Sequence, residues 1–529
     1  MQQNKDGEVK WCKQFGRFSL VYLFLVTVVS AESFADFKQA EAQAFSKYKD
    51  ARDAEFNNYL KAQWKEYNAQ LSKPLYEKPK PKNITPTIQK QIKSIGPKIN
   101  IVIKKPKVVA KKIEELTPPP KEIKKEPIEE PKEIVKKPKV IVKEIIEEPK
   151  KPIVKKVEKV QEIVVSKDIN FNFFGQKLGF NIDGSFKRAK FYPYDQSGIL
   201  NFFDTIASGD YEHTVAEIKA TASRLNLNDW GVYQLVTQFS NNVTANKDDN
   251  KLLSWFIFNK LGYEVKVGLA NKHVILMHYS KKIIYSTPNY NFNNKKFYVV
   301  ANYAKGSVGK LYTYKQSYPG ANKAMDLELS SLPNFEANLK SKSVSFRQLG
   351  KEYSASYHYD QNLIDFMATY PQADYETYFN SPMNESTYKE IATDLKKYVN
   401  NQQASVAINF VLNFVQKAFK YERDHQQFGR EKVMFADETL YYSKSDCEDR
   451  AILFSYLVKE LFGVGVIGVK YSDHMATALY IPMEGDSVKA GRRKFVIADP
   501  TYINANIGQS MPKYKRKTPD SFIVVKRDD

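Results

Sequence analysis

Hydrophobic and polar residues alternate in different ways along this chain, and each pattern predicts a different kind of segment. Aromatic and aliphatic residues between Phe37 and Tyr67 recur every three or four positions among charged residues. That spacing is typical of an amphipathic helix, so we expect residues 32–72 to be helical. Such a helix could bind a partner or a membrane surface. The mixture of acidic and basic residues on its polar face favours the alternative, a helix or helical hairpin that packs on itself, as in a coiled coil, or on the main body.

Residues 73–165 lack this periodicity and consist largely of Lys-Pro, Glu-Pro and Val/Ile-Lys units. Proline recurs too often there for a helix or a sheet, because it lacks the backbone donor that both structures need. We therefore expect a disordered, extended spacer rich in Pro, Lys and Glu, which resembles the spacers of periplasm-spanning proteins in composition only. Binding of an anionic polymer is the alternative role for this stretch.

From residue 166 onward the chain is rich in aromatic residues, and short strand patterns alternate with helical patterns. This mixture predicts an α+β fold, with one domain at 166–320, a connecting mixed segment at 321–395 and a second domain at 396–529. Helical periodicity covers residues 196–206, 209–224, 228–242, 361–370, 375–379, 386–399, 403–419 and 447–463. Strand patterns cover residues 169–173, 178–182, 343–346, 353–359, 464–471, 474–481 and 494–500.

The residues with the most chemical potential lie where the last predicted helix begins. Cys447 falls in the first turn of this helix, which is expected to stop at Gly463. Ser445 with Glu448 three residues later forms a capping-box pattern, and Asp446 is the alternative N-cap. With either cap, the unpaired amides and the helix dipole of the first turn favour a thiolate at Cys447.

Two further residues complete a candidate constellation. His474 opens one predicted strand, and Asp499 closes its neighbour. In an antiparallel pair these two ends meet, so Asp499 could orient an imidazole that deprotonates Cys447. A lone cysteine or histidine is usually a structural residue. Only the ordered set of three predicts catalysis.

This order of motifs resembles the transglutaminase-like (papain-like) superfamily over residues 400–515. A Cys at a helix start is followed by a His on a strand and by Asp-Pro-Thr at residues 499–501. Tyr421, residues 435–440 and the Asp-Cys-Glu-Asp run resemble the bacterial cysteine-peptidase branch. The resemblance implies a papain/transglutaminase-like C-terminal domain, and it assigns the roles of nucleophile, base and orienting residue to Cys447, His474 and Asp499.

The chain departs from the family pattern at one position and leaves one role open. Many relatives have glycine before the Asp-Cys pair, whereas this chain has Ser445. The default oxyanion donor is the amide of Cys447. Weaker side-chain candidates are Tyr441, Tyr442 and Gln427.

Residues 228–300 repeat the helix and strand order of the C-terminal domain. Gly262 corresponds to Gly463 and His273 corresponds to His474, but only polar residues occupy 247–250, the place of Cys447. We therefore predict a degenerate transglutaminase-like copy that cannot perform thiol chemistry, and we give His273 no catalytic role. Chance similarity between two helix-then-sheet segments is the alternative.

The N-terminal residues and the cysteine count change the expected location. Basic residues precede an apolar run from Phe18 to Val29, and a small-residue cleavage site ends at Ala31, so residues 1–31 are predicted to be a signal peptide. About a dozen apolar residues are short for a membrane span. A membrane tether is therefore expected only if the signal stays uncleaved. Its removal would take Cys12 away and leave Cys447 as the single thiol, with no intramolecular disulfide.

Net charge and missing motifs limit the partners. The net charge of +21 suits nucleic acid, anionic lipid or an acidic polymer. Because the chain contains no recognised nucleic-acid module and is predicted to be exported, a cell-envelope polymer is the better expectation. No cofactor or metal site is predicted, since paired-Cys, His-Glu-x-x-His, phosphate-loop and dinucleotide motifs do not occur in the sequence. His425 could lie near the active cleft or be an ordinary loop histidine.

The sequence thus predicts an exported protein of the periplasm or cell envelope that acts as a cysteine hydrolase or acyltransferase. Its substrates would be peptide or protein amide bonds, and Cys447, His474 and Asp499 would form the catalytic triad. The alternative is a non-enzymatic envelope scaffold that uses the retained fold to bind peptide or glycan. Fold alone does not distinguish these functions.

Overall fold

The computed structural model describes residues 32–62, 64–103, 167–302 and 308–526. The predicted signal peptide and most of the predicted spacer, from residue 104 onward, lie outside these residues. The chain divides into two compact units, one up to Ala62 and one from Gln63 onward. In the first unit, helix α1 spans Glu32–Lys61. None of the helices in the described ranges is both long and apolar enough to cross a membrane.

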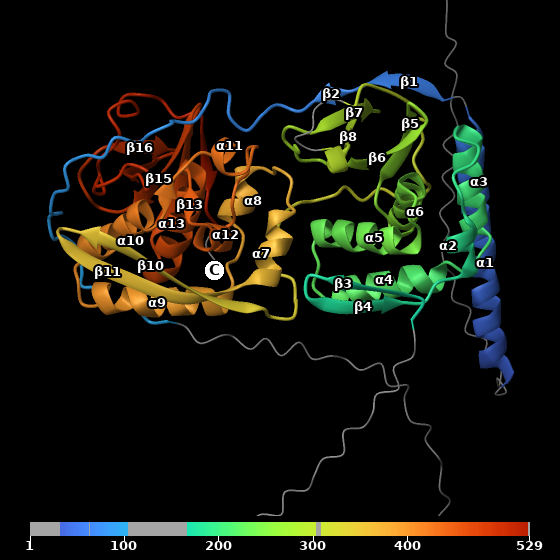
Figure 1. Cartoon of the computed structure of the whole chain (residues 1–529), viewed down its shortest axis with the longest axis horizontal. Helices are drawn as coiled ribbons and strands as arrows, with labels where there is room; N and C mark the ends of the chain where they lie inside the picture. Colours follow the sequence, from blue (N-terminus) through green and yellow to red (C-terminus); the bar gives the residue numbers. More distant parts are fainter. Residues whose placement is uncertain (1–31, 63, 104–166, 303–307, 527–529) are drawn as a thin grey trace, which may run out of the picture. The chain divides into compact units, whose positions relative to one another are not determined.

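The second unit contains two antiparallel sheets with helices packed beside them, so its class is α+β (Figure 1). The first sheet has the strand order β1-β9-β5-β6-β8-β7-β2. Buried aromatic side chains, including Tyr290, Phe292 and Phe297, pack on this sheet. Its strands are β1 (Lys65–Asn68), β2 (Gln70–Leu71), β5 (Val265–Ala270), β6 (His273–Tyr279), β7 (Pro288–Phe292), β8 (Lys295–Tyr298) and β9 (Lys310–Thr313).

Helices and a separate hairpin of β3 (Ile169–Phe173) and β4 (Gln176–Phe180) lie along the chain between β2 and β5 of this sheet, and a short 3₁₀ helix follows β8. Residues 169–173 and the helices near 196, 212 and 229 agree with the sequence expectation, because their apolar periodicity is regular. The elements are α2 (Gly184–Arg188), α3 (Gln196–Ala207), α4 (Glu212–Arg224), α5 (Asp229–Val243), α6 (Lys247–Lys260) and the short 3₁₀ helix η1 (Val300–Asn302).

The connecting region contains a long hairpin followed by helices. Strands β10 (Leu339–Gln348) and β11 (Lys351–Asp360) pair over their whole length, from Leu339 opposite Asp360 to Gln348 opposite Lys351. The helices that follow are α7 (Gln361–Ala368), α8 (Tyr375–Phe379), α9 (Glu385–Val399) and α10 (Ala404–Ala418). The strand and helix patterns predicted for this region are therefore confirmed.

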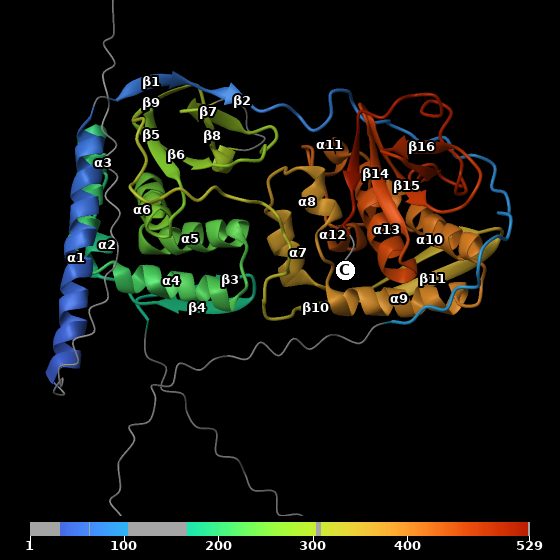
Figure 2. The same ribbon diagram turned by 180° about the vertical axis from the view of Figure 1, so that it is seen from behind.

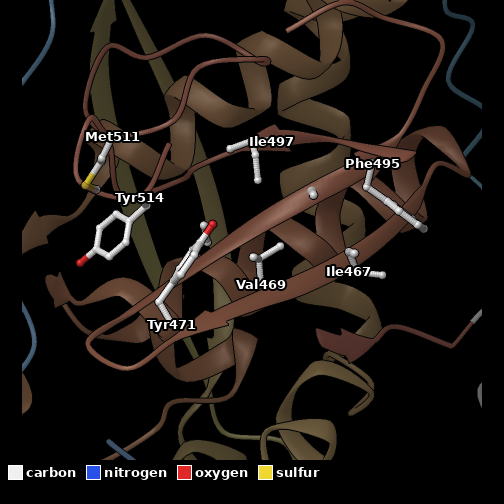
Figure 3. Close-up of a cluster of buried hydrophobic side chains, with 9 residues drawn as sticks. Ile467, Val469, Tyr471, Phe495, Ile497, Met511 and Tyr514 are labelled. Carbon is white, nitrogen blue, oxygen red and sulfur yellow. The ribbon is translucent and has the colours of Figure 1, made fainter. Parts of the chain in front are cut away.

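The second sheet has the strand order β16-β17-β15-β14-β18. A buried cluster from this sheet and the loop after it includes Val469, Ile497 and Tyr514 (Figure 3). The strands are β14 (Gly465–Tyr471), β15 (His474–Tyr480), β16 (Ser487–Ala490), β17 (Arg493–Ala498) and β18 (Ser521–Val524). The remaining elements of this half are β12 (Lys420–Tyr421), α11 (Asp424–Gln427), α12 (Ala436–Tyr441), β13 (Lys444–Ser445) and α13 (Cys447–Phe462).

Residues 65–71 belong to the first sheet and not to a helix, which corrects the helical prediction for the end of 32–72. Strand β1 pairs with β9, and β2 pairs with β7 at the opposite edge. Neighbouring strands lie about 4.8 Å apart, so a flat sheet would separate β9 from β7 by roughly 19 Å. Because one residue separates β1 from β2, the sheet must curl until its two edges approach each other.

Residues 73–103 also differ from the sequence expectation, which placed them in the disordered spacer. This segment, which we call the strap, runs along the outside of the C-terminal half (Figures 1 and 2). Leu75, Tyr76, Lys80 and Ile101 are buried. Hydrogen bonds between strap residues 78–101 and the C-terminal half involve Asn400, Asn401, Gln402, Ala404, Ser405, Asn413, Ser472, Ile503, Asn504 and Asn506.

The two sheets share an order of strands. In the first, the order β9-β5-β6-β8-β7 follows helix α6, and in the second β18-β14-β15-β17-β16 follows helix α13. Both central hairpins use a two-residue turn, which places His273 opposite Ala270 and His474 opposite Tyr471. This match of connectivity supports the proposal that residues 228–300 are a degenerate copy.

Candidate active site

Cys447 is the first residue of helix α13, and Asp446 is its N-cap. The main-chain N–H of Asp446 donates to Oδ2 of Asp449 at 3.0 Å, so the capping pair is Asp446 with Asp449. Of the two predicted caps, Asp446 is therefore the one observed. The helix ends where expected, at Gly463, which has the left-handed conformation with φ of 63°.

His474 and Asp499 meet as the strand arrangement predicts. Strands β15 and β17 pair antiparallel, with Thr477 opposite Ala498, so the start of one lies beside the end of the other. Nε2 of His474 lies 2.9 Å from Oδ2 of Asp499, and both side chains are buried. The other oxygen of Asp499 accepts main-chain N–H bonds from Thr501 and Tyr502 at 2.9 and 3.2 Å, which fixes the carboxylate.

Aromatic rings hold the imidazole of His474 from the side. The ring of Tyr514 stacks on it with centroids 4.7 Å apart and planes 25° apart. Tyr514 in turn contacts Tyr471, and both belong to the cluster in Figure 3. Nδ1 of His474 is buried and has no hydrogen-bond partner among the described residues. With Nε2 engaged by Asp499, Nδ1 is the nitrogen that remains for proton transfer.

A buried network connects the two sides of the site through Arg450. Its guanidinium donates to the main-chain oxygens of Gln416 and Phe419 at 3.2 and 2.6 Å and to Oγ of Ser445 at 3.1 Å. The side chain of Gln416 donates to the main-chain oxygen of Asp499 at 3.0 Å. Ser445, where many transglutaminase-like proteins have glycine, therefore accepts a hydrogen bond that a glycine could not accept.

The thiol of Cys447 is fully buried and protonated. Sγ donates to Oε2 of Glu448 at 3.2 Å, and the hydroxyl of Tyr76 lies 3.8 Å from Sγ. Burial raises the pKa of the thiol well above its ordinary value, and the carboxylates of Glu448 and Asp446 raise it further. A main-chain hydrogen bond from Met475, the residue after His474, acts in the opposite direction. No hydrogen bond joins Cys447 to His474, so the predicted triad is brought together only in part.

Beside the thiol lies a cluster of carboxylates, which we call the acidic pocket: Asp424, Glu431, Asp446 and Glu448. The ammonium of Lys80 from the strap sits among them, 2.7 Å from Asp446, 2.8 Å from Glu431 and 3.0 Å from Asp424. It also forms an ion pair with Oε1 of Glu448. The cation thus contacts all four carboxylates.

The pKa values of the groups in the acidic pocket are set by burial and by the contact of one ammonium with four carboxylates. Burial raises the pKa of Glu448 to about 7, and the nearby Asp424 adds to the effect of burial while Lys80 opposes it. Burial and Asp446 raise the pKa of Asp424 to about 8. For Lys80 itself, burial lowers the pKa, but the carboxylates outweigh burial and hold it well above the ordinary value.

The same oxygen atoms have the chemistry of a hard-cation site. The groups Asp424-Glu431-Glu448 and Asp424-Asp446-Asp449 each bring their ligand atoms within 4.8 Å of one another. Carboxylate oxygens are the ligands that Mg²⁺ and Ca²⁺ prefer. The ammonium of Lys80 lies among these oxygens, so the charge that a metal ion would supply comes here from the chain itself.

The weaker candidates from the sequence lie elsewhere or stay open. The rings of Tyr441 and Tyr442 contact each other and the rings of Tyr359 and Phe428. Oε1 of Gln427 is buried with no hydrogen-bond partner in the described ranges. His425 is largely exposed and lies 3.6 Å from Glu431, at the outer side of the acidic pocket.

Sequence reasoning missed the residues that cover the site. Tyr76 and Lys80 lie in a stretch of Lys-Pro units, where nothing distinguishes a buried lysine from a solvated one. One available signal was the pair of a leucine and a tyrosine at residues 75 and 76, two large apolar neighbours between Pro74 and Pro79 in an otherwise polar stretch.

Comparisons with family models, curated proteins and solved structures return no match to this chain.

Proposed function

We propose that this chain is a latent cysteine hydrolase or acyltransferase that acts on amide bonds of peptides or proteins. The observation that carries the proposal is the buried His474–Asp499 pair beside the thiol. Nδ1 of His474 has no hydrogen-bond partner among the described residues. The main-chain N–H of the next residue, Met475, donates a hydrogen bond to Sγ of Cys447 at the start of helix α13. Thiol, imidazole and carboxylate are the groups that nucleophilic catalysis requires, and the proposed reaction needs the thiol and the imidazole to come within hydrogen-bond reach. The motif order supports it, since residues 400–515 resemble the transglutaminase-like superfamily.

In the proposed reaction, His474 takes the proton of Cys447, and the thiolate attacks the substrate carbonyl to form a carbon–sulfur bond. The amide of Cys447 at the helix start would stabilise the oxyanion. Collapse breaks the carbon–nitrogen bond, and His474 returns the proton to the leaving amine. Water or an amine, deprotonated by His474, then attacks the thioester and releases Cys447. Which acceptor is used decides between hydrolysis and acyl transfer.

The protein is latent in this proposal because the strap must dissociate from the site before a substrate can reach Sγ of Cys447. Tyr76 lies 3.8 Å from the thiol, and the side chains of Tyr76 and Cys447 are both buried. Glu448 accepts a hydrogen bond from the thiol, which keeps its proton, so Cys447 does not act as a nucleophile in this state. Removal of the strap would end this burial, which is the largest cause of the raised thiol pKa.

The second candidate is a non-enzymatic, exported scaffold that binds extended peptide or glycan. A specific observation favours it: Cys447 forms no hydrogen bond with His474, and its thiol pKa is raised well above the ordinary value. The surface of the C-terminal half also buries Tyr76 and Lys80 of the protein's own extended chain, as a peptide-binding surface would bury the side chains of its ligand. For either function we propose the periplasm or cell envelope as the location, on the basis of the predicted signal at residues 1–31.

The two candidates differ in the reactivity of Cys447 once the strap is loosened. We would use the full chain with Cys12→Ser, so that Cys447 is the only thiol, and add Tyr76→Ala to uncover it. The rate of alkylation by iodoacetamide is then measured against pH with and without His474→Ala. The enzyme requires a thiolate that persists well below the ordinary pKa of about 8.5 and loses about tenfold or more in rate at neutral pH without His474.

The control replaces Lys78, an exposed residue of the same strap, by alanine, and this change should leave the thiol protected. A thiol that titrates near its ordinary value in the Tyr76→Ala chain and ignores the loss of His474 rejects the enzyme and leaves the scaffold.

A further inference from the structure

We propose that the acidic pocket beside Cys447 is a subsite for a lysine side chain of the substrate peptide, and that Lys80 of the strap is its internal occupant. The lysine-containing peptide is a substrate only if the proposed enzymatic function holds. The recognition of lysine itself is independent of any catalysis.

The pocket is built by the C-terminal half alone. Its carboxylates come from helix α11, from the loop after it and from the start of helix α13. Oδ2 of Asp424 also accepts the main-chain N–H of Lys432 at 2.9 Å, and Asp446 is held as the N-cap of α13. One oxygen each of Asp424 and Asp446 is buried and has no hydrogen-bond partner among the described residues. The pocket therefore has more acceptors than Lys80 fills.

Glu448 places the pocket directly beside the nucleophile. One of its oxygens pairs with Lys80, and the other accepts hydrogen bonds from Sγ of Cys447 and from the hydroxyl of Tyr76, both at 3.2 Å. A lysine bound in the pocket would pair with Glu448, the same carboxylate that accepts a hydrogen bond from the thiol. The pocket is thus in a position to orient a peptide across the reacting atom.

The strap is bound in the way that extended peptides are recognised, through main-chain hydrogen bonds and buried anchor side chains. The N–H of Lys78 donates to the main-chain oxygen of Ser472 at 3.3 Å, and Tyr421 donates to the main-chain oxygen of Pro81 at 2.9 Å. Tyr76 and Lys80 are buried, whereas residues 77–79 between them are exposed. Two anchored side chains four residues apart therefore fix the register of the bound segment.

Charge balance favours a lysine in the ligand. A substrate that reaches Sγ must displace Tyr76 and with it the neighbouring Lys80. Without their cation, the clustered carboxylates must take up protons or remain as unpaired charges, and both outcomes are less favourable than pairing with an ammonium. A compact ammonium has three donors for this cluster, and the observed distances of 2.7–3.0 Å show that it fits. The productive ligand should bring the same group.

The test uses a fluorescein-labelled peptide that copies residues 73–84, and the full chain with Cys12→Ser and Lys80→Ala, so that the pocket is empty. Fluorescence anisotropy measures binding in a buffer with EDTA, which keeps divalent cations out of the pocket. We expect saturable binding, and about tenfold or more weaker binding when alanine replaces the Lys80 position of the peptide, since hydrogen bonds to charged groups are among the strongest. Alanine at the Lys78 position is the matched control and should change binding less than about twofold.

The unsubstituted chain supplies the competition control. Its own strap is present at a high effective concentration, so the lysine peptide should bind it at least about tenfold more weakly than it binds the Lys80→Ala chain. If Lys80→Ala does not fold, Lys80→Gln keeps most of the side chain without its charge and takes its place. Asp424→Asn in the pocket should weaken the lysine peptide but not its alanine version.

Binding that ignores the Lys80 position, or equal binding to both chains, would overturn the subsite. None of these readouts depends on turnover. A chain that binds lysine peptides but whose thiol stays inert would reject the enzyme and keep the lysine pocket. A chain with a reactive thiol but no preference for lysine peptides would keep the enzyme and reject the lysine pocket.

Discussion

At the scale of single residues, Glu448 determines the state of the site. It accepts a hydrogen bond from the thiol of Cys447 with one oxygen and pairs with Lys80 through the other. Burial raises its pKa above the ordinary range, and Lys80 opposes this shift. The thiol, the cation and this carboxyl therefore form one coupled unit, and a change in any of them alters the protonation of the other two.

The pH dependence of stability can be tested at a carboxyl outside this unit. Asp437 is fully buried, and burial raises its pKa to about 7, although the N–H of Asn384 opposes the shift. Unfolded Asp437 has an ordinary pKa of about 3.9, so folding takes up a proton between these values and stability falls as pH rises from about 4 to 7. This loss is on the order of 4 kcal/mol. Urea unfolding of Asp437→Asn at several pH values should show a shallower fall than the unsubstituted chain.

The control for this prediction is Asp394→Asn. The pKa of Asp394 lies below its ordinary value: burial raises it, but the hydrogen bonds from Lys397 and Ser356 outweigh burial. Its stabilising effect is present above the unfolded pKa and is lost only in acid. The substitution should leave the slope between pH 5 and 8 unchanged. An equal slope in the Asp437→Asn chain would contradict the proposed titration.

The sequence indicated the candidate catalytic residues better than the residues that cover them. Cys447, His474 and Asp499 stand out because each marks the end of an element with clear periodicity. Tyr76 and Lys80 did not, because their burial depends on carboxylates more than 340 residues away along the chain. Local patterns contain no information on such a contact. Proline-rich composition predicts an extended backbone correctly but does not indicate whether that backbone is solvated or bound.

At the scale of elements, helix α13 carries the thiol of Cys447 at its N-terminus and is terminated at its C-terminus by Gly463. Its φ is 63°, and a Cβ at this position would meet nothing within 4 Å. Gly463→Ala should therefore cost about 1 kcal/mol of unfolding free energy, from backbone strain alone. Asn tolerates this conformation better, so Gly463→Asn should cost less. Urea denaturation measures both, and a loss of several kcal/mol would mean that packing at this position is tighter than described.

Element boundaries were predictable where the hydrophobic periodicity and the turn or capping residues indicate the same boundary. Strands β14, β15 and β17 were found because short apolar runs are separated by polar turns. The helical prediction failed at residues 65–71, because Trp64 and Tyr67 continue the helical spacing while their neighbours pair with β9 and β7. A partner strand more than 200 residues away decides the structure of this segment, and short strands of this kind depend on such tertiary contacts.

At the scale of the whole molecule, the two sheets support the proposed duplication and also show how the first copy differs. His273 occupies the same register position as His474, but it is largely exposed and pairs with Asp248 at 2.9 Å. No thiol exists at the start of helix α6, which begins with Lys247. The first half shares the strand order but has no thiol at the start of helix α6, and its sheet pairs with the strands of residues 65–71 that lead into the strap.

The two sheets should nevertheless unfold as one cooperative body. The described residues from Trp64 onward belong to a single compact unit. Trp230 donates to Thr369 at 2.8 Å and Tyr285 donates to Asp374 at 2.6 Å, so the first half is tied to the connecting region. Residues 64–103 add a second connection, since they pair with the first sheet and then pack along the second half.

Native-state hydrogen exchange in increasing urea tests this coupling. Amides of helices α6 and α13 should exchange through the same global opening, with equal free energies and equal urea dependence. Tyr76→Ala with Lys80→Ala weakens only the strap connection, so α13 should then exchange at lower free energy while α6, tied through Trp230 and Tyr285, changes less. If α6 and α13 already differ in the unsubstituted chain, the halves are separate folding units. The strap would then be a ligand that one unit presents to the other, and its release would need no global unfolding.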